Sequence, residues 1–188
     1  MGTQPAIGIA WAAWALSWFA ASWWSGHTAR RASVGSELPS RLFVIAGVVL
    51  LFGLYPHVRA IELPLRRMGP AGDWLMVALT ALGFLFAWWA RLHLGRLWSA
   101  TVTRKAEHRV VDSGPYAVVR HPIYTGIIVA ALATAADRGT ALGWVGAALM
   151  TCGWYLKARL EERFLGADLP GYPEYARRVP MLVPFLRV

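Results

Sequence analysis

The amino-acid sequence predicts an all-α integral membrane protein with about five transmembrane helices. Hydrophobic residues make up 57% of the 188 residues, and only 15% are charged. The apolar residues lie in long runs that are separated by clusters of basic residues. Helix is expected for each run because a backbone inside lipid must satisfy its own hydrogen bonds.

Five uncharged runs define the expected spans. The first, residues 5–24, has the length that crosses a bilayer as a helix. It lacks a basic segment before it and is rich in tryptophan, so a retained helix is expected rather than a signal peptide. Some of the other runs are shorter than the roughly 20 residues of a span and need flanking residues. They cover residues 42–56, 74–90, 122–136 and 139–156.

The net charge of +9 follows the predicted topology. When the loops are assigned alternately to the two sides of five spans, 15 of the 19 Lys and Arg residues fall on the side of the C-terminus. The positive-inside rule then predicts an N-out, C-in protein, placed in the inner membrane if the source is bacterial. We expect the lipid bilayer as partner, no nucleic acid, and no obligate protein partner.

The chain is expected to divide near residue 90. Residues 1–90 form a scaffold of three spans, and residues 91–188 carry a polar loop, a two-helix hairpin and a proline-broken tail. The polar stretch 91–120 is long for a simple connection, and long ordered loops in compact folds are often functional. Cys152 is the only cysteine, so no intramolecular disulfide and no cysteine-based zinc site are expected.

The segment 114–126 is the first candidate site. Pro122 suits the first position of a helix, where its missing N–H costs nothing. Arg120 and His121 then lie at a helix N-terminus, which favours an anion. Tyr124 lies one turn further in, and Gly126 leaves room for close approach. The alternative is that Arg120 and His121 only mark the edge of the membrane.

The second and third candidate sites lie near the end of the chain. Arg159 and Glu162 share one face of a helix, whereas Glu161 and Glu162 project about 100° apart, so both acids are not expected to serve one ligand equally. A solvated helix end with a local ion pair is the alternative. The tail 172–184 is rich in aromatic and basic residues and forms either an interfacial anchor or a cap over a pocket.

Together these segments resemble the isoprenylcysteine carboxyl methyltransferase family. The pattern is Gly-Pro-Tyr-x-x-Val-Arg-His-Pro-x-Tyr-x-Gly, a hydrophobic hairpin, Glu-Glu, and Tyr-x-x-Tyr-x-x-Arg-Val-Pro, in this order. More broadly, it is similar to the superfamily that includes phospholipid N-methyltransferases. The resemblance covers roughly residues 90–185, including the segment 94–99. The family usually has Phe-Gly shortly before the first tyrosine of the tail, whereas this chain has Asp-Leu-Pro-Gly at 168–171.

The resemblance implies S-adenosylmethionine as cofactor, a cofactor pocket on the cytoplasmic side formed by the C-terminal half, and no metal. It implies a cofactor site made of Tyr116, Arg120, His121, Tyr124, Gly126 and either Glu161 or Glu162. Either acid suits the ammonium or ribose of the cofactor, and Tyr116 suits its adenine. Arg159 and Arg178 are candidates for aligning an anionic acceptor, and with Arg120 they form the expected catalytic set.

The expected function is therefore methyl transfer at the membrane to a lipophilic or small acceptor. An isoprenylcysteine-like carboxylate, a lipid amine and a small thiol all remain open. One alternative is an NADPH-dependent membrane reductase of the sterol-reductase type, whose C-terminal region is similar. A second alternative is a non-enzymatic membrane assembly subunit. The apolar runs contain no Asp, Glu, Lys or Arg, so an intramembrane ion pathway is not expected.

Overall fold

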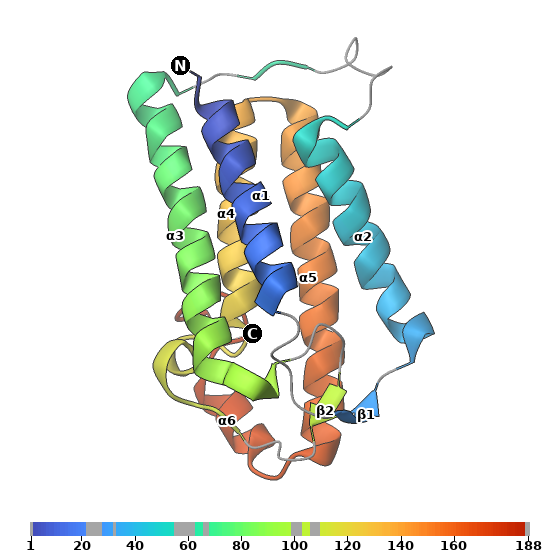
Figure 1. Ribbon diagram of the computed structural model, residues 1–188. Coiled ribbons are helices and arrows are strands. Elements are labelled where there is room, and N and C mark those ends of the chain that lie inside the picture. Colours follow the sequence, from blue (N-terminus) through green and yellow to red (C-terminus); the bar gives the residue numbers. More distant parts are fainter. Residues whose placement is uncertain are drawn as a thin grey trace.

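In the part of the chain that the structure describes, long helices run up and down side by side (Figure 1). The computed structural model describes residues 2–21, 28–31, 33–54, 63–65, 68–98, 103–105 and 110–186. A short sixth helix follows the bundle. The helices are α1 (Thr3–Ala21), α2 (Val34–Phe52), α3 (Pro70–Leu94), α4 (Pro122–Arg138), α5 (Ala141–Asp168) and α6 (Tyr172–Arg178).

The two ends of the bundle differ in content. At the upper end of Figure 1 lie the start of α1, the end of α2, the start of α3 and the α4–α5 turn. At the lower end lie the end of α3, the start of α4, the end of α5 and α6. The helices α1 to α5 alternate in direction, so successive connections lie at opposite ends of the bundle.

A two-stranded antiparallel sheet departs from the all-α prediction. β1 (Thr28–Arg31) pairs with β2 (Thr103–Lys105), and the pair lies at the lower end. It joins the connector between α1 and α2 to the loop that follows α3. Strands of three and four residues are too short for a period-2 pattern to show in a sequence. Two 3₁₀ turns, η2 (Gly95–Leu97) and η3 (Gly114–Ala117), complete the described elements.

α4 and α5 form the predicted two-helix hairpin, and only Gly139 and Thr140 separate them. α4 ends at Arg138 and is capped by Gly139, whose φ of 61° is the left-handed conformation that glycine adopts without strain. Thr140 then caps α5 by accepting a hydrogen bond from the N–H of Gly143 at 3.2 Å. α5 continues without a break to Asp168, as the sequence predicts. Its 28 residues span roughly 42 Å, more than the hydrocarbon core of a bilayer, so its last third extends beyond the apolar run.

Small residues bring the helices into close contact. Gly83 of α3 and Gly126 of α4 face each other, since a Cβ on either glycine would collide with the carbonyl oxygen of the other. Gly146 and Gly153 of α5 approach the backbone of α2 in the same way, and Gly47 of α2 faces α5. Small residues at helix crossings are typical of membrane bundles, where close packing replaces a hydrophobic driving force.

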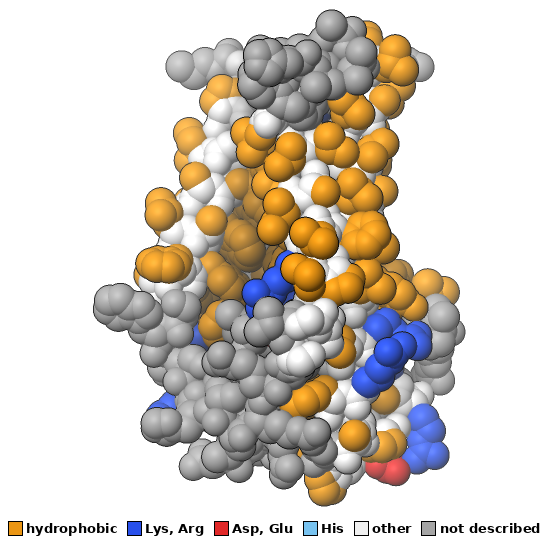
Figure 2. Space-filling model, turned by 90° about the vertical axis from the view of Figure 1, so that its right-hand side faces the viewer, with side chains coloured by type: hydrophobic (Ala, Val, Ile, Leu, Met, Phe, Trp, Pro, Cys, Tyr) orange, Lys and Arg blue, Asp and Glu red, His pale blue; other side chains and the backbone are white. Residues whose placement is uncertain are grey.

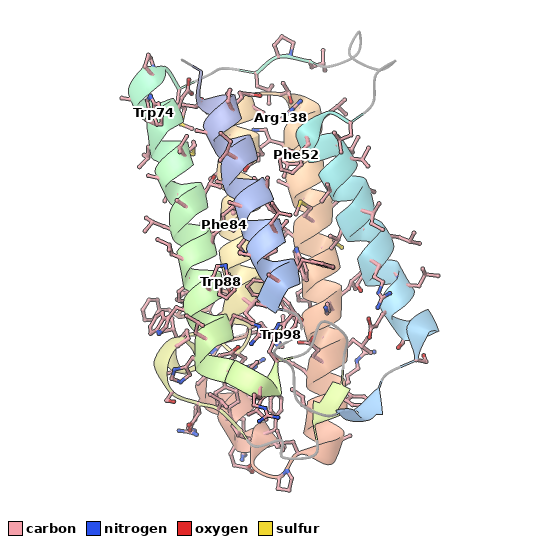
Figure 3. All side chains as sticks on the ribbon, viewed as in Figure 1. Phe52, Trp74, Phe84, Trp88, Trp98 and Arg138 are labelled. Carbon is pink, nitrogen blue, oxygen red and sulfur yellow. The ribbon has the colours of Figure 1, made fainter. Side chains whose placement is uncertain are left out.

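Aromatic side chains fill the space between α1 and α3. The ring centroid of Phe84 lies 4.8 Å from that of Trp11 and 5.2 Å from that of Trp14. Trp18 continues the row toward Trp88 and Trp98, which Figure 3 shows below Phe84. α1 is therefore attached to the bundle by a continuous row of aromatic packing.

An apolar belt covers the bundle above the lower end. In the face shown in Figure 2, hydrophobic side chains cover the upper bundle, and most of the visible Lys and Arg side chains lie below them. Two helices, α2 over Gly35–Phe52 and α3 with its extension over Pro70–Leu97, are long and apolar enough to cross a membrane. α4 has 17 residues, slightly fewer than a span needs. The fold is thus helical and of membrane type.

Candidate functional site

The start of α4 and the last third of α5 meet at the lower end of the bundle. Pro122 occupies the first turn of α4, as predicted, so Arg120 and His121 come directly before the helix. Glu161 and Glu162 lie on α5 beyond its apolar run. Residues about 40 positions apart in the sequence thus form one polar cluster, which we call the α4–α5 cluster: Arg120, His121, Tyr124, Glu161 and Glu162.

Arg120 is the most highly connected member of the cluster. Its Nε donates to Oε1 of Glu162 at 2.6 Å. Its Nη1 donates to the carbonyl oxygen of Ala176 at 2.6 Å and to that of Val179 at 2.5 Å. The guanidinium therefore ties α5 to α6, and its side chain is only 8% exposed. Arg120 contributes to the site by holding Glu162 and the tail in place.

His121 lies between the two carboxylates. Its Nε2 lies 3.3 Å from Oε1 of Glu162, and its Nδ1 lies 3.4 Å from Oε2 of Glu161. Burial lowers the pKa of His121, but the hydrogen bonds and the charges of Glu161 and Glu162 outweigh burial and raise it above its ordinary value. The two carboxylates therefore favour the protonated imidazole, in which both nitrogens donate.

The two acids share His121 but differ in their other partners. Glu161 Oε1 accepts a hydrogen bond from the Tyr124 hydroxyl at 2.5 Å, whereas Glu162 faces Arg120. Burial raises the pKa of Glu162, yet hydrogen bonds from His121 and Arg120 bring it down to about 2. Hydrogen bonding by His121 and the charge of Lys157 likewise leave the pKa of Glu161 below its usual value despite burial. Both carboxylates are charged at neutral pH.

The tail lies across the start of α4. The N–H of Arg120 donates to the carbonyl of Pro180 at 2.8 Å, and the N–H of His121 donates to that of Met181 at 3.1 Å. The Tyr175 hydroxyl donates to the carbonyl oxygen of Tyr116 at 2.7 Å. Of the two interpretations of the tail, a cap over the site agrees with these contacts.

The structure does not bring all predicted residues into the cluster. Arg159 is exposed and donates to the Tyr155 hydroxyl at 3.3 Å, and Glu162 pairs with Arg120, so the described residues do not show the local ion pair between Arg159 and Glu162 that was the alternative interpretation. Arg178 is exposed and lies 3.3 Å from Asp112. A sequence shows that a helix end is charged, but it does not show which charge the next element covers.

Gly126 and Tyr116 lie beside the cluster, but each packs against a residue of α3. Gly126 faces Gly83 of α3, which accounts for its missing side chain by helix packing, and its contact with a cofactor stays a prediction. Tyr116 is buried and stacks on His93, with 6.3 Å between the ring centroids. Burial and the charge of Glu161 raise the pKa of Tyr116 well above its ordinary value, so its hydroxyl stays neutral.

Two further residues of α5, Trp154 and Lys157, lie against the cluster, and they were not among the predicted site residues. The Trp154 ring stacks on the Tyr124 ring, with 4.9 Å between centroids, and Lys157 Nζ lies 5.6 Å from each of these centroids. Trp154, Lys157 and Glu161 are spaced by three and four residues, so they share one face of α5. That spacing is the feature of the sequence from which Trp154 and Lys157 could have been predicted.

The chemistry of the cluster fits S-adenosylmethionine. The two carboxylates suit an ammonium or a ribose, the cations suit a carboxylate, and Tyr124 and Trp154 offer aromatic faces. Within the described ranges, the buried Nε1 of Trp154 has no hydrogen-bond acceptor, which leaves one donor for a ligand. The same ranges contain no group of three His, Cys, Asp or Glu that could hold a metal ion.

A small cavity at the upper end, of about 40 Å³, has room for only a water or two.

The bundle, its apolar belt and the α4–α5 cluster together define a helical membrane protein with a polar site at one end. Residues 76–166 match the model of the isoprenylcysteine carboxyl methyltransferase (ICMT) family. This match covers just under half of the chain and confirms the resemblance to that family seen in the sequence.

Known proteins similar to this chain include a metal-resistance protein and two methyltransferases. It is 36% identical over 120 residues to the cobalt-zinc-cadmium resistance protein CzcN of Cupriavidus metallidurans, covering 61% of this chain and 53% of the relative. It is 32% identical over 156 residues to methanethiol S-methyltransferase 2 of Bradyrhizobium diazoefficiens, covering 77% and 59%. It is 29% identical over 87 residues to protein-S-isoprenylcysteine O-methyltransferase B of Arabidopsis thaliana, covering 45% and 44%. The chain thus spans only about half the length of these relatives.

A solved structure supports the fold. The eukaryotic intramembrane Ras methyltransferase ICMT superposes on this chain with a TM-score of 0.55 at 22% sequence identity. The match covers 78% of this chain and 52% of that one. The arrangement of the helices is therefore that of a known membrane methyltransferase.

Proposed function

We propose that this protein transfers a methyl group from S-adenosylmethionine to a lipophilic or small acceptor at the membrane. The observation that carries the proposal is the α4–α5 cluster, which pairs two carboxylates with Arg120 and His121 at the start of a helix. When bound, the cofactor supplies an electrophilic methyl group on a sulfonium. The protein then needs mainly positioning and electrostatics.

Within this proposal each member of the cluster has a part. Glu161 and Glu162 bind the ammonium or the ribose, and His121 and Tyr124 fix the directions of the two carboxylates. Arg120 is a positioning residue because its hydrogen bonds hold Glu162 and the carbonyl groups of the tail. The tail excludes water from the start of α4, which strengthens the electrostatic interactions there.

The proposal also includes five spans, with the N-terminus outside and the cluster on the cytoplasmic side. The up-and-down course of α1 to α5 supports it, as does the position of α6 and the C-terminal residues beside the lower end (Figure 1). The charge asymmetry of the sequence points the same way. A topology reporter fused after Asp168 tests the cytoplasmic assignment, and a reporter fused after Gly139 serves as its opposite-side control.

The acceptor belongs to one of three classes: an isoprenylcysteine-like carboxylate, a lipid amine or a small thiol. The names of two relatives support a prenylated cysteine and methanethiol. Arg159 and Arg178 remain candidates for guiding an anionic acceptor, and both are exposed at the lower end. A methyl-transfer assay with labelled cofactor against a lipid and thiol panel identifies the class.

Binding of S-adenosylhomocysteine tests the cofactor assignment. We expect the purified protein in lipid nanodiscs to bind it, and we expect H121A and E162Q each to bind it at least about tenfold more weakly, since each variant loses an interaction with a charged partner. E174Q is the matched control, because Glu174 is an exposed acid paired with Arg177. Stabilisation by NADPH with none by S-adenosylhomocysteine would identify a reductase instead. Stabilisation by neither would favour a non-enzymatic subunit.

A further inference from the structure

The tail continues past the α4–α5 cluster along the start of α4. Three consecutive carbonyl groups, those of residues 180–182, accept hydrogen bonds from the first part of α4 and the two residues before it. Their donors follow in the same order, from the N–H groups of Arg120 and His121 to the hydroxyl of Thr125, which donates to Leu182 at 2.7 Å. The tail therefore runs in the direction of α4, from the lower end of the bundle toward the apolar belt.

Leu182 is attached to the outward face of α4. Thr125, Val129 and Leu132 are spaced by four and three residues, so they share one face of that helix. Val129 and Leu132 are 37% and 39% exposed, whereas most of the other residues of α4 are buried. Exposed apolar side chains on a helix of a membrane-type bundle indicate contact with lipid. The tail thus reaches α4 at the lower end of its lipid-facing side.

A tight turn follows directly after Leu182. The N–H of Leu186 donates to the carbonyl of Val183 at 3.2 Å, which closes a four-residue turn with Pro184 in its second position. Phe185 is in the third position and has a φ of 67°, the one positive φ of a non-glycine residue within the described ranges. Proline followed by a positive φ is the pattern of a type II turn, in which the third residue is usually glycine or asparagine.

Phenylalanine is an unfavourable residue for this position in water. A bulky side chain at positive φ strains the backbone, and Phe185 is 98% exposed, so packing against the described residues does not offset that strain. Val183 and Leu186 beside it are 53% and 55% exposed. Glycine would form the same turn without strain, so the aromatic ring indicates surroundings that bind it.

We propose that Val183, Phe185 and Leu186 form an apolar anchor turn that inserts into the bilayer at its boundary with water, and that the bilayer thereby holds the tail over the α4–α5 cluster. The partner is lipid because the turn is attached where the uncharged run of α4 begins, at Pro122. Aromatic side chains favour this boundary. The tail is then a cap up to Leu182 and an anchor beyond it. The inference goes beyond the proposed function and does not depend on the acceptor.

Insertion of the anchor turn couples the membrane to the cap through the three hydrogen bonds. Because Leu182 directly precedes the turn, withdrawal of the turn from the bilayer pulls the carbonyl groups of residues 180–182 away from α4. The N–H groups of Arg120 and His121 then lose their acceptors and become open to water. Their exchange with deuterium therefore reports whether the cap is closed.

Spin labels measure the depth of the anchor turn. In a C152A background a nitroxide attaches only to a cysteine introduced at a chosen position. In nanodiscs we expect the label of F185C, like that of V129C, to collide more with oxygen than with a water-soluble nickel complex. The label of E174C, at an exposed acid of α6, should show the reverse order. A label at position 185 that behaves like the label at position 174 overturns the proposal.

A charge at the same position tests the coupling without a label. We expect F185D to raise deuterium exchange in the peptide that contains residues 120 and 121 by at least about tenfold, since the apolar burial of the ring is lost and a charge is excluded from the bilayer. A167D is the matched control, because Ala167 is exposed on the last turn of α5, and it should leave this exchange unchanged. Equal exchange in F185D and the wild type contradicts the proposal, and so does an equal rise in F185D and A167D.

Two further substitutions separate the ring from the turn. F185G relieves the strain but removes the ring, and we expect exchange at residues 120 and 121 to rise by at least about fivefold. F185W keeps an aromatic ring and should behave like the wild type. If exchange in F185G were unchanged or slower, Phe185 would serve the turn alone, and the anchor would be overturned. Neither readout measures methyl transfer, so these outcomes leave the proposed function intact.

Discussion

Gly83 of α3 and Gly126 of α4 lie so close that a Cβ added to Gly83 would come within 2.5 Å of the Gly126 carbonyl oxygen. The backbones of two neighbouring helices touch at this point. Because the neighbours are backbone atoms, no side chain can rotate to make room. The contact lies one turn above the α4–α5 cluster and sets the distance between α3 and the start of α4.

The first prediction follows from that contact. G126V should separate α3 from α4 and lower the free energy of unfolding by about 1–3 kcal/mol, the usual cost of overpacking. The measurement is the midpoint of thermal unfolding in one detergent, followed by tryptophan fluorescence. G166A is the control, because a Cβ at Gly166 meets nothing within 4 Å. A midpoint for G126V equal to that of G166A would show that the helices can move apart freely.

The second prediction concerns Arg120 as a link between α5 and the tail. R120K keeps the charge but loses the fork that reaches Glu162 and the carbonyl groups of Ala176 and Val179 together. We expect amide hydrogen exchange to rise by at least about tenfold in α6 and the tail, because a local opening becomes easier by one or two hydrogen bonds. R177K, at an exposed position of α6, should change nothing. Equal exchange in wild type and R120K would mean that Arg120 does not hold the tail.

The third prediction is a range of pH in which the tail is best protected from amide hydrogen exchange. The pKa of Glu162 is lowered to about 2 from an ordinary 4.5, so its contribution is complete above 4.5 and is lost as the pH falls toward 2. The pKa of His121 is raised, so its contribution is complete below an ordinary 6.5 and is lost as the pH rises through the raised value. Protection of the tail should therefore be greatest between about pH 4.5 and 6.5.

Exchange rates of the tail, corrected for the intrinsic effect of pH, measure this window. H121N cannot titrate, so its profile should lose the decline on the alkaline side and keep the decline on the acid side. If H121N declined at alkaline pH just as the wild type does, His121 would not be the group responsible.

The fourth prediction concerns the attachment of α1 at the upper end. Trp11 Nε1 donates to the Thr134 hydroxyl of α4 at 2.9 Å, and Thr3 donates to the buried Asp137 nearby. T134V keeps the shape of the side chain and removes the acceptor, so the free energy of unfolding should fall by about 1 kcal/mol. T151V is a matched control, because the Thr151 hydroxyl only returns to a carbonyl of its own helix. If T134V and T151V destabilised the protein equally, the loss would come from the hydrogen bond that each threonine hydroxyl donates to a carbonyl of its own helix, and not from Trp11.

The order of motifs was enough to predict which two helices carry the cluster. Pro122 fixes the start of α4, so the positions of Arg120, His121 and Tyr124 follow from local rules. The uninterrupted run into Glu161 likewise predicts that α5 continues past the membrane. Local sequence specifies where a helix begins, and with it which side chains stand at its end.

What covers those side chains could not be predicted. Arg120 was expected to help hold the cofactor, which stays a prediction, and its hydrogen bonds to Glu162 and the tail were not foreseen. Arg159 and Arg178 were expected in the site, yet both are exposed. The direction of a side chain relative to another element depends on how two helices cross, and local sequence patterns do not predict that crossing. Gly126 illustrates this, since its partner Gly83 lies 43 positions away.

The pairing of α2 with α5 through Gly47, Gly146 and Gly153 has a consequence for biosynthesis. α2 ends at Phe52, and its partner begins only at Ala141. At about 5–20 residues per second of translation, the glycine-bearing face of α2 spends roughly 5–20 s in the membrane before α5 is made. During this interval that face is available to insertion chaperones or to another copy of the nascent chain. Substitutions in α5 should therefore affect the yield of assembled protein before they affect its activity.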